Sequence, residues 1–394
     1  MQLVAYGAQD IYLTGNPQIT FFKVVYRRHT NFSMESIRQT FSGTVGFGND
    51  VTATISRNGD LVYRMYLQVG GTTTVSTNNP GSAWIKSVEL EIGGQNIDKH
   101  SGIWMETWAE LTEPNDAGIT GSNGRNERQP LVHLTKFQLM SGMGGVNGNG
   151  TAAGMWTVPL RFWFCRNPGL ALPLIALQYH EVKVILDHTI QTHFTASGSG
   201  TGSTNKLWCD YIYLDTDERR RFAQVSHEYL IEQVQEQTLS TNVSNDLNFN
   251  HPVKELIWTA HGGTVGAAEW TTPLITRAAN KSDKTWQLKL NGHDRFAARP
   301  GSYFSRTQIW EAHSGYGGLT PHATGVGRAS DAISVYSFAL KPEEHQPSGT
   351  CNFSRIDNAQ LVSEVAVAAN TVCFAVNYNV LRIMSGMGGL AYSN

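Results

Sequence analysis

Cysteine is scarce in this chain of 394 residues, which contains four: Cys165, Cys209, Cys351 and Cys373. No two of them form a Cys-x-x-Cys pair, and no histidine cluster stands near them. The spacing therefore argues against a zinc ribbon and against a disulfide scaffold. The four positions are typical of free buried thiols in a reducing compartment.

Charge is also scarce, and it is nearly balanced. Charged residues make up 16% of the chain, and the formal net charge is -2 at pH 7. Proteins that bind DNA mainly through its phosphates normally carry a basic excess. This balance argues against general DNA binding, and we expect no direct sequence-specific contact with nucleic acid.

Long apolar runs are missing as well. No stretch approaches the roughly 18 consecutive apolar residues that a membrane-spanning helix needs. The N-terminus has no basic leader, and Gln9 and Asp10 interrupt its apolar residues, so we do not expect a signal peptide. Without a secretory route, chance explains the Asn-x-Ser/Thr triplets at Asn31, Asn149, Asn242, Asn280 and Asn352.

Enzyme signatures are not found: there is no phosphate-binding Gly-rich loop, no GxSxG elbow and no HExxH. Asp187, His188 and His193 lie close together, but a metal site needs three or four convergent ligands, so a structural role is favoured. Glu89 and Glu91 would share one strand face, as a glycosidase pair might. The wet face of a sheet explains them more simply. We expect no catalytic residues, no metal and no cofactor.

Short runs of alternating apolar and polar residues are abundant, and 39 glycines accompany them. The alternation predicts strands at 61–69, 88–92, 179–186, 207–214, 227–234, 255–260, 285–290, 333–340 and 371–381. Many short strands joined by long loops are typical of sandwiches and barrels. The best helix candidate is 100–112, where Trp104, Trp108 and Leu111 share one face and are typical of a core-packing stripe.

A polar segment near the middle of the chain, DTDERRRF at 215–222, separates two comparable sets of predicted strands. We expect the domain boundary there, at 217–224. The three arginines at 219–221 could contact phosphate. The acidic residues at 215, 217 and 218 nearly cancel their charge, which favours a solvated linker in which these charges pair locally.

The hexapeptide MSGMGG occurs twice, at 140–145 and at 384–389. The residues before the two copies differ, with KFQL before the first and NVLRI before the second. We interpret the repeat as coincidence and not as a trace of duplication.

The segment GNPQITFFKVVYRRHTNF, at 15–32, combines aromatic and cationic residues. If it is extended, Phe21, Lys23 and Val25 lie on one face and Phe22, Val24 and Tyr26 on the other, so both faces are mainly apolar. A strand that is apolar on both faces lies between layers or against a neighbour. Nucleic-acid stacking platforms also combine aromatics with arginine. They usually have a basic groove, so packing or assembly is favoured.

The N-terminal block LVAYGAQDIYLTGNPQITFFKVVYRRHTNF, at 3–32, resembles the amino-terminal signature of the major capsid proteins of nucleocytoplasmic large DNA viruses, the chlorovirus type above all. Matching blocks recur in order to the end of the chain. They include ISRNGDL (55–61), VELEIGGQNIDKH (88–100), PGLALPLIALQYHEVK (168–183), DYIYLDTDERRRFAQ (210–224), NFNHPVKELIW (248–258), LNGHDRFAARPGSYF (290–304) and NYNVLRIMSGMGGLAYSN (377–394).

The resemblance implies an all-β fold of two consecutive eight-stranded antiparallel jelly rolls with short helices in the loops. The implied order is an N-terminal arm at 1–24, a first jelly roll at 25–216, a linker at 217–224 and a second jelly roll at 225–394. The resemblance also implies a structural protein of the virion, not an enzyme. Its homotrimers would form pseudo-hexagonal capsomers, assembled in the host cytoplasm, that tile the icosahedral shell of a large double-stranded DNA virus with an internal membrane.

The implied partners are other copies of the chain, neighbouring capsomers, and minor capsid and penton proteins, with the arm on the inner side towards the membrane. Assembly residues would be Phe21, Phe22, Tyr26, Arg27 and Arg28. The aromatics would fill space within and between subunits, and the arginines would be salt-bridging or rim residues. Some relatives carry glycans on outward loops, which makes Asn149 and Asn280 candidates.

Three alternatives stay open from the sequence. A carbohydrate-active or carbohydrate-binding double jelly roll would need a cleft with convergent acids or aromatics. A scaffold or minor capsid protein could share the fold but leave the mature particle. A vertex-specific paralogue of the shell protein is the third.

Overall fold

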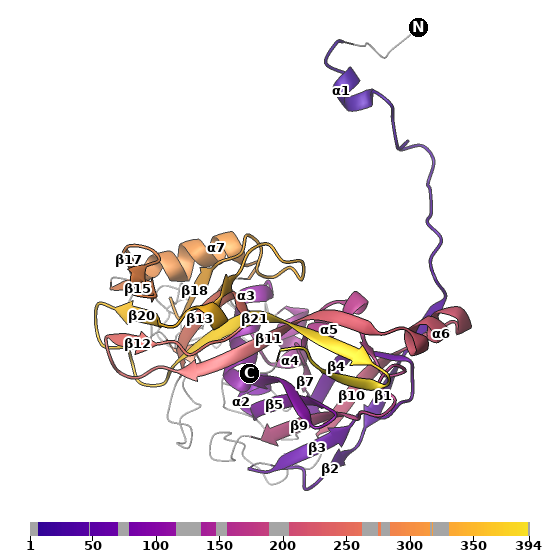
Figure 1. The fold of residues 1–394 in the computed structure, drawn as a ribbon, viewed down its shortest axis with the longest axis horizontal. Coiled ribbons are helices and arrows are strands. Elements are labelled where there is room, and N and C mark those ends of the chain that lie inside the picture. Colours follow the sequence, from indigo (N-terminus) through magenta and orange to yellow (C-terminus); the bar gives the residue numbers. More distant parts are fainter. Residues whose placement is uncertain are drawn as a thin grey trace, which may run out of the picture.

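The computed structural model describes residues 7–46, 48–69, 79–115, 135–146, 156–188, 205–261, 275–276, 284–315, 317 and 331–392. Strands dominate these ranges and form two neighbouring bodies, with an extended N-terminal segment that leaves one side (Figure 1). The candidate glycan positions Asn149 and Asn280, and the histidine at 193, lie outside the described residues.

The first body contains two antiparallel sheets. One sheet has the order β1 (Phe32–Gln39), β10 (Lys206–Leu214), β4 (Leu61–Val69) and β7 (Trp156–Pro159), with β8 (Leu172–Pro173) also beside β4. The other has the order β2 (Phe41–Ser42), β3 (Asp50–Thr54), β9 (Val182–His188), β5 (Ile85–Ile92) and β6 (Gln95–Ser101). Their inward side chains, such as Met65, Val88 and Val184, meet in one apolar core, which Phe164 of the short helix at 163–166 joins.

The second body repeats this plan. Its larger sheet contains β11 (His227–Thr238), β21 (Thr371–Met384) and β13 (Pro252–His261), with β18 (Ile333–Ser337), β14 (Ile275–Thr276) and β19 (Cys351–Asn352) beside β13 and β22 (Met387–Leu390) beside β21. Its smaller sheet contains β12 (Ser244–Asp246), β20 (Ala359–Ser363), β15 (Thr285–Leu290), β16 (His293–Asp294) and β17 (Arg299–Pro300). Trp258, Trp286 and Phe304 lie at the centre of its core.

Both bodies have the same strand order. When β2, β8, β14, β17, β19 and β22 are set aside, the described ranges of each body contain eight strands, which are numbered here from 1 to 8 in chain order. One sheet then has the order 1-8-3-6 and the other 2-7-4-5, in the first body as in the second. Two facing antiparallel sheets of eight strands, built from long-range pairings of this kind, form a jelly roll. The predicted fold of two consecutive eight-stranded jelly rolls is confirmed.

The predicted strands agree with the structure most closely where the alternation is uninterrupted. β4 and β15 have the predicted limits. β9 begins three residues later than predicted, at Val182. The reason lies in the C-terminal segment, because the Tyr179 N–H donates to the Gly386 carbonyl and His180 Nδ1 lies 2.8 Å from the Gly388 carbonyl oxygen.

Short helices occupy the N-terminal segment and the connections between strands. They are α1 (Ile11–Thr14), α2 (Pro80–Ala83), α3 (Gly102–Thr112), α4 (Lys136–Ser141), α5 (Trp163–Arg166), α6 (Thr216–Gln224), α7 (Gln308–Ala312), the short η1 (Pro168–Leu170) and η5 (Phe353–Arg355), and the π-helix η4 (Tyr303–Thr307). The helix predicted at 100–112 is confirmed as α3, and Ser101 caps it by accepting a hydrogen bond from the Trp104 N–H. No helix in the described ranges is long and apolar enough to cross a membrane.

The segment predicted as a linker, 217–224, lies inside the exposed helix α6. Asp215 caps this helix by accepting from the Thr216 N–H. The sequence predicted that Arg219 pairs with the neighbouring acids, but it does not. Its Nε lies 3.0 Å from Oδ1 of Asp60, in the turn before β4. Helical geometry directs this side chain back onto the first jelly roll, so the local-pairing prediction is wrong for Arg219.

The four cysteines are free, as predicted. Cys165, Cys209 and Cys373 are buried, and Cys351 is partly buried. Burial raises the pKa of the Cys165 thiol to about 12. These thiols therefore pack as small apolar side chains.

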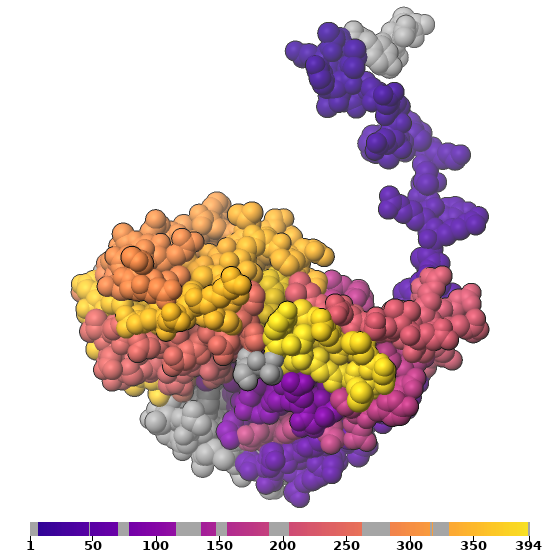
Figure 2. Space-filling view, in the orientation of Figure 1, coloured from indigo at the N-terminus to yellow at the C-terminus, as the bar shows by residue number. Residues whose placement is uncertain are grey.

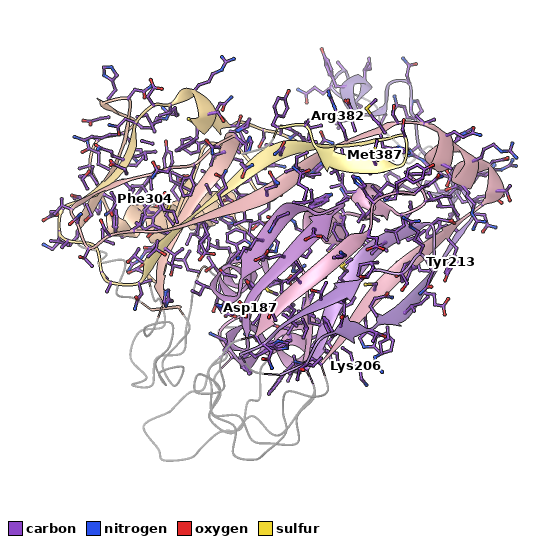
Figure 3. The ribbon with its side chains drawn as sticks, turned by 60° about the horizontal axis from the view of Figure 1, so that its bottom comes forward. Asp187, Lys206, Tyr213, Phe304, Arg382 and Met387 are labelled. Carbon is purple, nitrogen blue, oxygen red and sulfur yellow. The ribbon has the colours of Figure 1, made fainter. Side chains whose placement is uncertain are left out.

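The two jelly rolls share an apolar core. Trp104, Trp108 and Leu111 of α3 pack against β13, β18 and β21 of the second jelly roll, at Ile257, Ile333, Val335, Val372, Phe374 and Val376. The predicted core stripe is confirmed, but its partner is the other jelly roll. In return, Ile231, Leu381 and Ile383 of β11 and β21 join the core of the first. Figure 3 shows the β21–β22 ribbon lying across the first jelly roll.

Candidate functional site

The segment before β1 is the first candidate surface. Residues 7–31 run away from the body as an arm, which leaves it close to α6 (Figures 1 and 2). The side chains of Phe21, Phe22 and Tyr26 are 88%, 98% and 83% exposed. Ile11, Tyr12, Leu13, Ile19, Val24 and Val25 are also exposed. Monomeric soluble proteins rarely expose so large a continuous apolar surface, so the arm has the character of a binding segment.

The structure corrects one part of the prediction for this arm. Phe21, Phe22 and Tyr26 do not fill space within the subunit, and 15–31 form no strand. A segment that is apolar on both faces needs neighbours on both sides, and the described part of a single chain supplies none. Arg27 and Arg28 likewise make no ion pair within the described ranges. The roles of all five residues between subunits stay predictions.

A buried charge cluster joins the two jelly rolls. The carboxylate of Glu232 of β11 forms ion pairs with Arg166 of α5 at 2.8 Å and with Nζ of Lys254 in β13 at 2.9 Å. His345 Nδ1 lies 3.5 Å from the same carboxylate. The Arg166 guanidinium also lies over the ring of Trp108, 5.1 Å from its centroid. The first jelly roll thus supplies one cation and the second supplies the carboxylate.

The electrostatics of this cluster favour a charged Glu232. Burial by itself raises the pKa of this carboxyl, but Arg166, His345 and Lys254 outweigh burial and lower it to about 2. For Lys254, which is fully buried, burial lowers the pKa, and Glu232 offsets only part of that effect. Sequence reasoning missed this cluster. Its signal was a charged pair, Lys254 and Glu255, within an otherwise apolar strand.

A second buried cluster lies nearby. Nε2 of His313 is 2.9 Å from Glu255, and its Nδ1 is 3.0 Å from Glu343. The residues after His313 cover the end of α3: the Gly315 N–H donates to the Leu111 carbonyl and the Ser314 hydroxyl to that of Thr112. The last carbonyls of a helix have no partner within it. Here a loop of the second jelly roll binds the end of a helix from the first.

Alkaline pH should weaken this junction. Burial lowers the pKa of His313, but Glu255 and Glu343 outweigh burial and raise it to about 9. The pKa of His313 is higher in the folded state than in the unfolded state. Its ion pairs therefore stabilise the folded chain fully below pH ~6.5, and this stabilisation is lost as the pH rises through about 9. Between about pH 6 and pH 10, wild type should lose about 3 kcal/mol more unfolding free energy than His313→Gln in urea titrations.

A matched control is His293→Gln, since His293 is exposed. This variant should follow the wild-type pH dependence. Equal slopes for wild type and His313→Gln would show that the ion pairs of His313 add nothing to the junction.

The residues that the sequence singled out for chemistry have structural partners. His188 is buried, with Nδ1 2.8 Å from the Asn49 carbonyl oxygen and Nε2 2.9 Å from the Asn205 amide. Glu89 and Glu91 form ion pairs on the sheet surface, with Lys99 at 2.6 Å and Lys183 at 4.0 Å. In the described part of the chain, no three His, Cys, Asp or Glu residues gather as a metal site would require.

A cleft of about 490 Å³ opens near the junction, lined by residues of β4, α3, α4 and α5 and by Glu343. Two carboxylates, Glu113 and Glu343, are among its lining residues. Arg161 binds the first and His313 the second. A glycosidase needs two carboxyl groups that face the substrate. One of the two must act as an acid, with a raised pKa. Burial raises the pKa of Glu343, but its contacts with His313 and Ser314 outweigh burial and lower it, which disfavours this role for Glu343.

Comparisons with known proteins agree over the whole chain. Residues 20–215 match the family model described as major capsid protein N-terminus, and residues 218–389 match that of the large eukaryotic DNA virus major capsid protein. The chain is 53% identical to the major capsid protein of Pyramimonas orientalis virus, over 100% of this chain and 99% of the relative. It is 43% identical to that of Paramecium bursaria Chlorella virus 1, with the same coverage.

Solved structures give the same result. A quasi-atomic model of the PBCV-1 virus capsid matches with a TM-score of 0.73 and 39% identity, over 95% of this chain and 100% of that one. The Faustovirus major capsid protein matches with a TM-score of 0.67 at 14% identity, which shows a shared fold. The chain thus belongs to the major capsid protein family of large eukaryotic DNA viruses, the structural proteins of the virion capsid.

Proposed function

We propose that three copies of this chain form a pseudo-hexagonal capsomer, and that these capsomers tile the icosahedral shell of a large double-stranded DNA virus with an internal membrane. The main support is the repeated strand order, because two jelly rolls with one topology make a chain that is nearly two-fold repetitive. Three such chains around an axis present six similar bodies. The shared core of α3 with β13, β18 and β21 supports a fixed angle between them.

The proposed partners follow from this arrangement. They are the other two copies, neighbouring capsomers, and minor capsid and penton proteins, with assembly in the host cytoplasm. We place residues 1–24, the first part of the arm, on the inner side towards the membrane. The proposed domains follow at 25–216 and 225–394, connected by 217–224, and the strands of the first domain begin with β1 at Phe32. Glycans on outward loops, with Asn149 and Asn280 as candidates, belong to the same proposal.

The mass in solution tests this proposal directly. One chain has a mass of 43.4 kDa, so a homotrimer has 3 × 43.4, or about 130 kDa. Obligate assemblies bury more than the ~1,600 Å² of a standard interface, so the trimer should persist on dilution. Size-exclusion chromatography with light scattering gives this mass. A monomer that resists concentration would contradict the proposal and would redirect work to glycan binding.

Removal of the arm aromatics should impair assembly. In Phe21→Ser/Phe22→Ser, every chain loses two phenylalanine side chains from the proposed contacts between subunits. Burial of each contributes roughly 1.5–3 kcal/mol. Both residues are exposed in the single chain, so the variant should fold normally. We expect a lower trimer fraction and a lower melting temperature of the trimer, measured by light scattering and calorimetry.

Gln18→Ser is the matched control, since it changes an exposed polar residue of the same arm. It should assemble like wild type. Unchanged trimer yield and stability in the double serine variant would remove the assembly role of Phe21 and Phe22.

A further inference from the structure

A second exposed apolar surface surrounds the turn between β21 and β22. Met384 and Met387 stand opposite each other in this hairpin, and their side chains are 54% and 52% exposed. Tyr179, 76% exposed, lies against the same turn, with its N–H bonded to the Gly386 carbonyl at 2.9 Å. A Cβ added to Gly386 would lie 2.6 Å from the Tyr179 ring. These three side chains, the hairpin patch, therefore form one surface.

The hairpin patch and the arm lie at the same end of the molecule. In Figures 1 and 2, β21 ends towards α6, and the arm leaves the body beside α6. Figure 3 labels Met387 near this end of β21. Both surfaces are apolar, and within the described ranges neither has a partner that covers it. An unbranched thioether adapts to an aromatic ring and makes favourable sulfur–aromatic contacts. The Phe21–Phe22 pair of the arm is chemically suited to such a surface.

Charge supports the same pairing. The arm carries Lys23, Arg27 and Arg28 beside its aromatics. The patch has exposed carboxylates on its flanks: Glu181 follows Tyr179 by two residues, and Glu228 lies opposite Arg382 in the ladder of β11 and β21. Both acids are exposed and have one cationic neighbour each, so they can accept a further cation at the rim.

We propose that the arm of one copy docks on the hairpin patch of a neighbouring copy, with Phe21 and Phe22 against Met384, Met387 and Tyr179. This inference rests on the proposed homotrimer and adds the site that receives the arm. The neighbour is the occupant, because the arm runs away from its own body (Figure 1). Phe22 lies ten positions before Phe32, so it can lie at most ~35 Å from the start of β1.

Disulfide trapping between two tagged chains tests this docking. Full-length Phe22→Cys and full-length Met387→Cys are co-expressed with different tags, purified as the assembled species and oxidised. A covalent pair that contains both tags is expected on a non-reducing gel. Each variant co-expressed with wild type is the control for Cys351, the partly buried native thiol.

The outcomes separate this inference from the proposed function. An assembled trimer without the mixed-tag pair overturns the docking site and leaves the trimer intact. In a further variant, both cysteine substitutions are placed in the same chain. A disulfide within that chain, together with no mixed-tag pair, would overturn the choice of a neighbouring copy as the site that the arm binds. A monomeric wild type overturns the trimer and this docking together.

Tryptic cleavage at Lys23, Arg27 and Arg28 gives a second readout on the assembled protein. In Met384→Ser/Met387→Ser the arm should be cut roughly 10-fold faster than in wild type, since lost apolar burial weakens docking. Leu340→Ser, also at a largely exposed leucine, should retain wild-type protection. Equal cleavage rates in wild type and the double methionine variant would overturn the proposal.

Discussion

Replacement of Trp104 by alanine is expected to lower the free energy of unfolding by about 3–5 kcal/mol, the usual range for a buried tryptophan. Trp104 is 3% exposed, and its ring centroid lies 5.4 Å from that of Trp108 and 5.1 Å from that of Phe374. The substitution therefore opens a cavity between the two jelly rolls. Urea unfolding followed by circular dichroism measures the loss.

Trp310→Ala is the matched control, because Trp310 is 82% exposed on the short helix α7. A surface substitution of this kind changes stability by about 0.5 kcal/mol or less in the single chain. If Trp104→Ala were as mild as Trp310→Ala, α3 could not be the element that holds the two jelly rolls together.

The second large effect is expected at Glu232. In Glu232→Ala, Arg166 and Lys254 lose the carboxylate that neutralises them in the interior. Removal of one partner from a buried ion pair destabilises a protein by about 3–5 kcal/mol, because the remaining charge is uncompensated. The free energy of unfolding at neutral pH should fall by that amount. Glu228→Ala on the same strand is the control, since its pair with Arg382 is exposed and contributes about 1 kcal/mol or less.

Acid adds a signature specific to this carboxylate. The pKa of Glu232 is about 2 in the folded chain and ~4.5 in the unfolded chain. Its contribution to the free energy of unfolding is therefore present above pH ~4.5 and is lost as the pH falls towards about 2. Wild type should lose more stability than Glu232→Ala over this interval. Parallel acid profiles of the two proteins would contradict a charged, paired Glu232.

The pattern of apolar and polar residues predicted the structure correctly where the environment of a residue depends on its neighbours along the chain. Alternation at 61–69 and 285–290 predicted β4 and β15 within their observed limits, because successive strand residues face opposite sides of a sheet. The stripe at Trp104 and Trp108 predicted α3 for the corresponding reason at a helical period.

The repeated hexapeptide MSGMGG marks the limit of such reasoning. At 140–145 it ends helix α4, with Gly142 in the left-handed region at φ 63°. At 384–389 it turns β21 into β22, with Ser385 at φ 52° and Gly386 at φ 82°. The flanks decide between them, since Thr135 caps a helix before the first copy and β11 pairs with the strand before the second. Their different structures support the interpretation of coincidence.

The sequence alone determined the nine strands with regular alternation, the connecting helix α3, the free thiols and, through its resemblance to capsid proteins, the two jelly rolls. Strands with a weaker alternation, such as β3, β7 and β20, were not predicted. Only the tertiary structure decided which charges are buried together. Arg166, Glu232, Lys254 and His345 come from distant parts of the chain and meet because strand pairing brings them to one junction. The tertiary structure also decided that the arm aromatics are exposed. Burial of a side chain depends on which distant parts of the chain pack against it, and the order of apolar and polar residues in one segment does not contain that information.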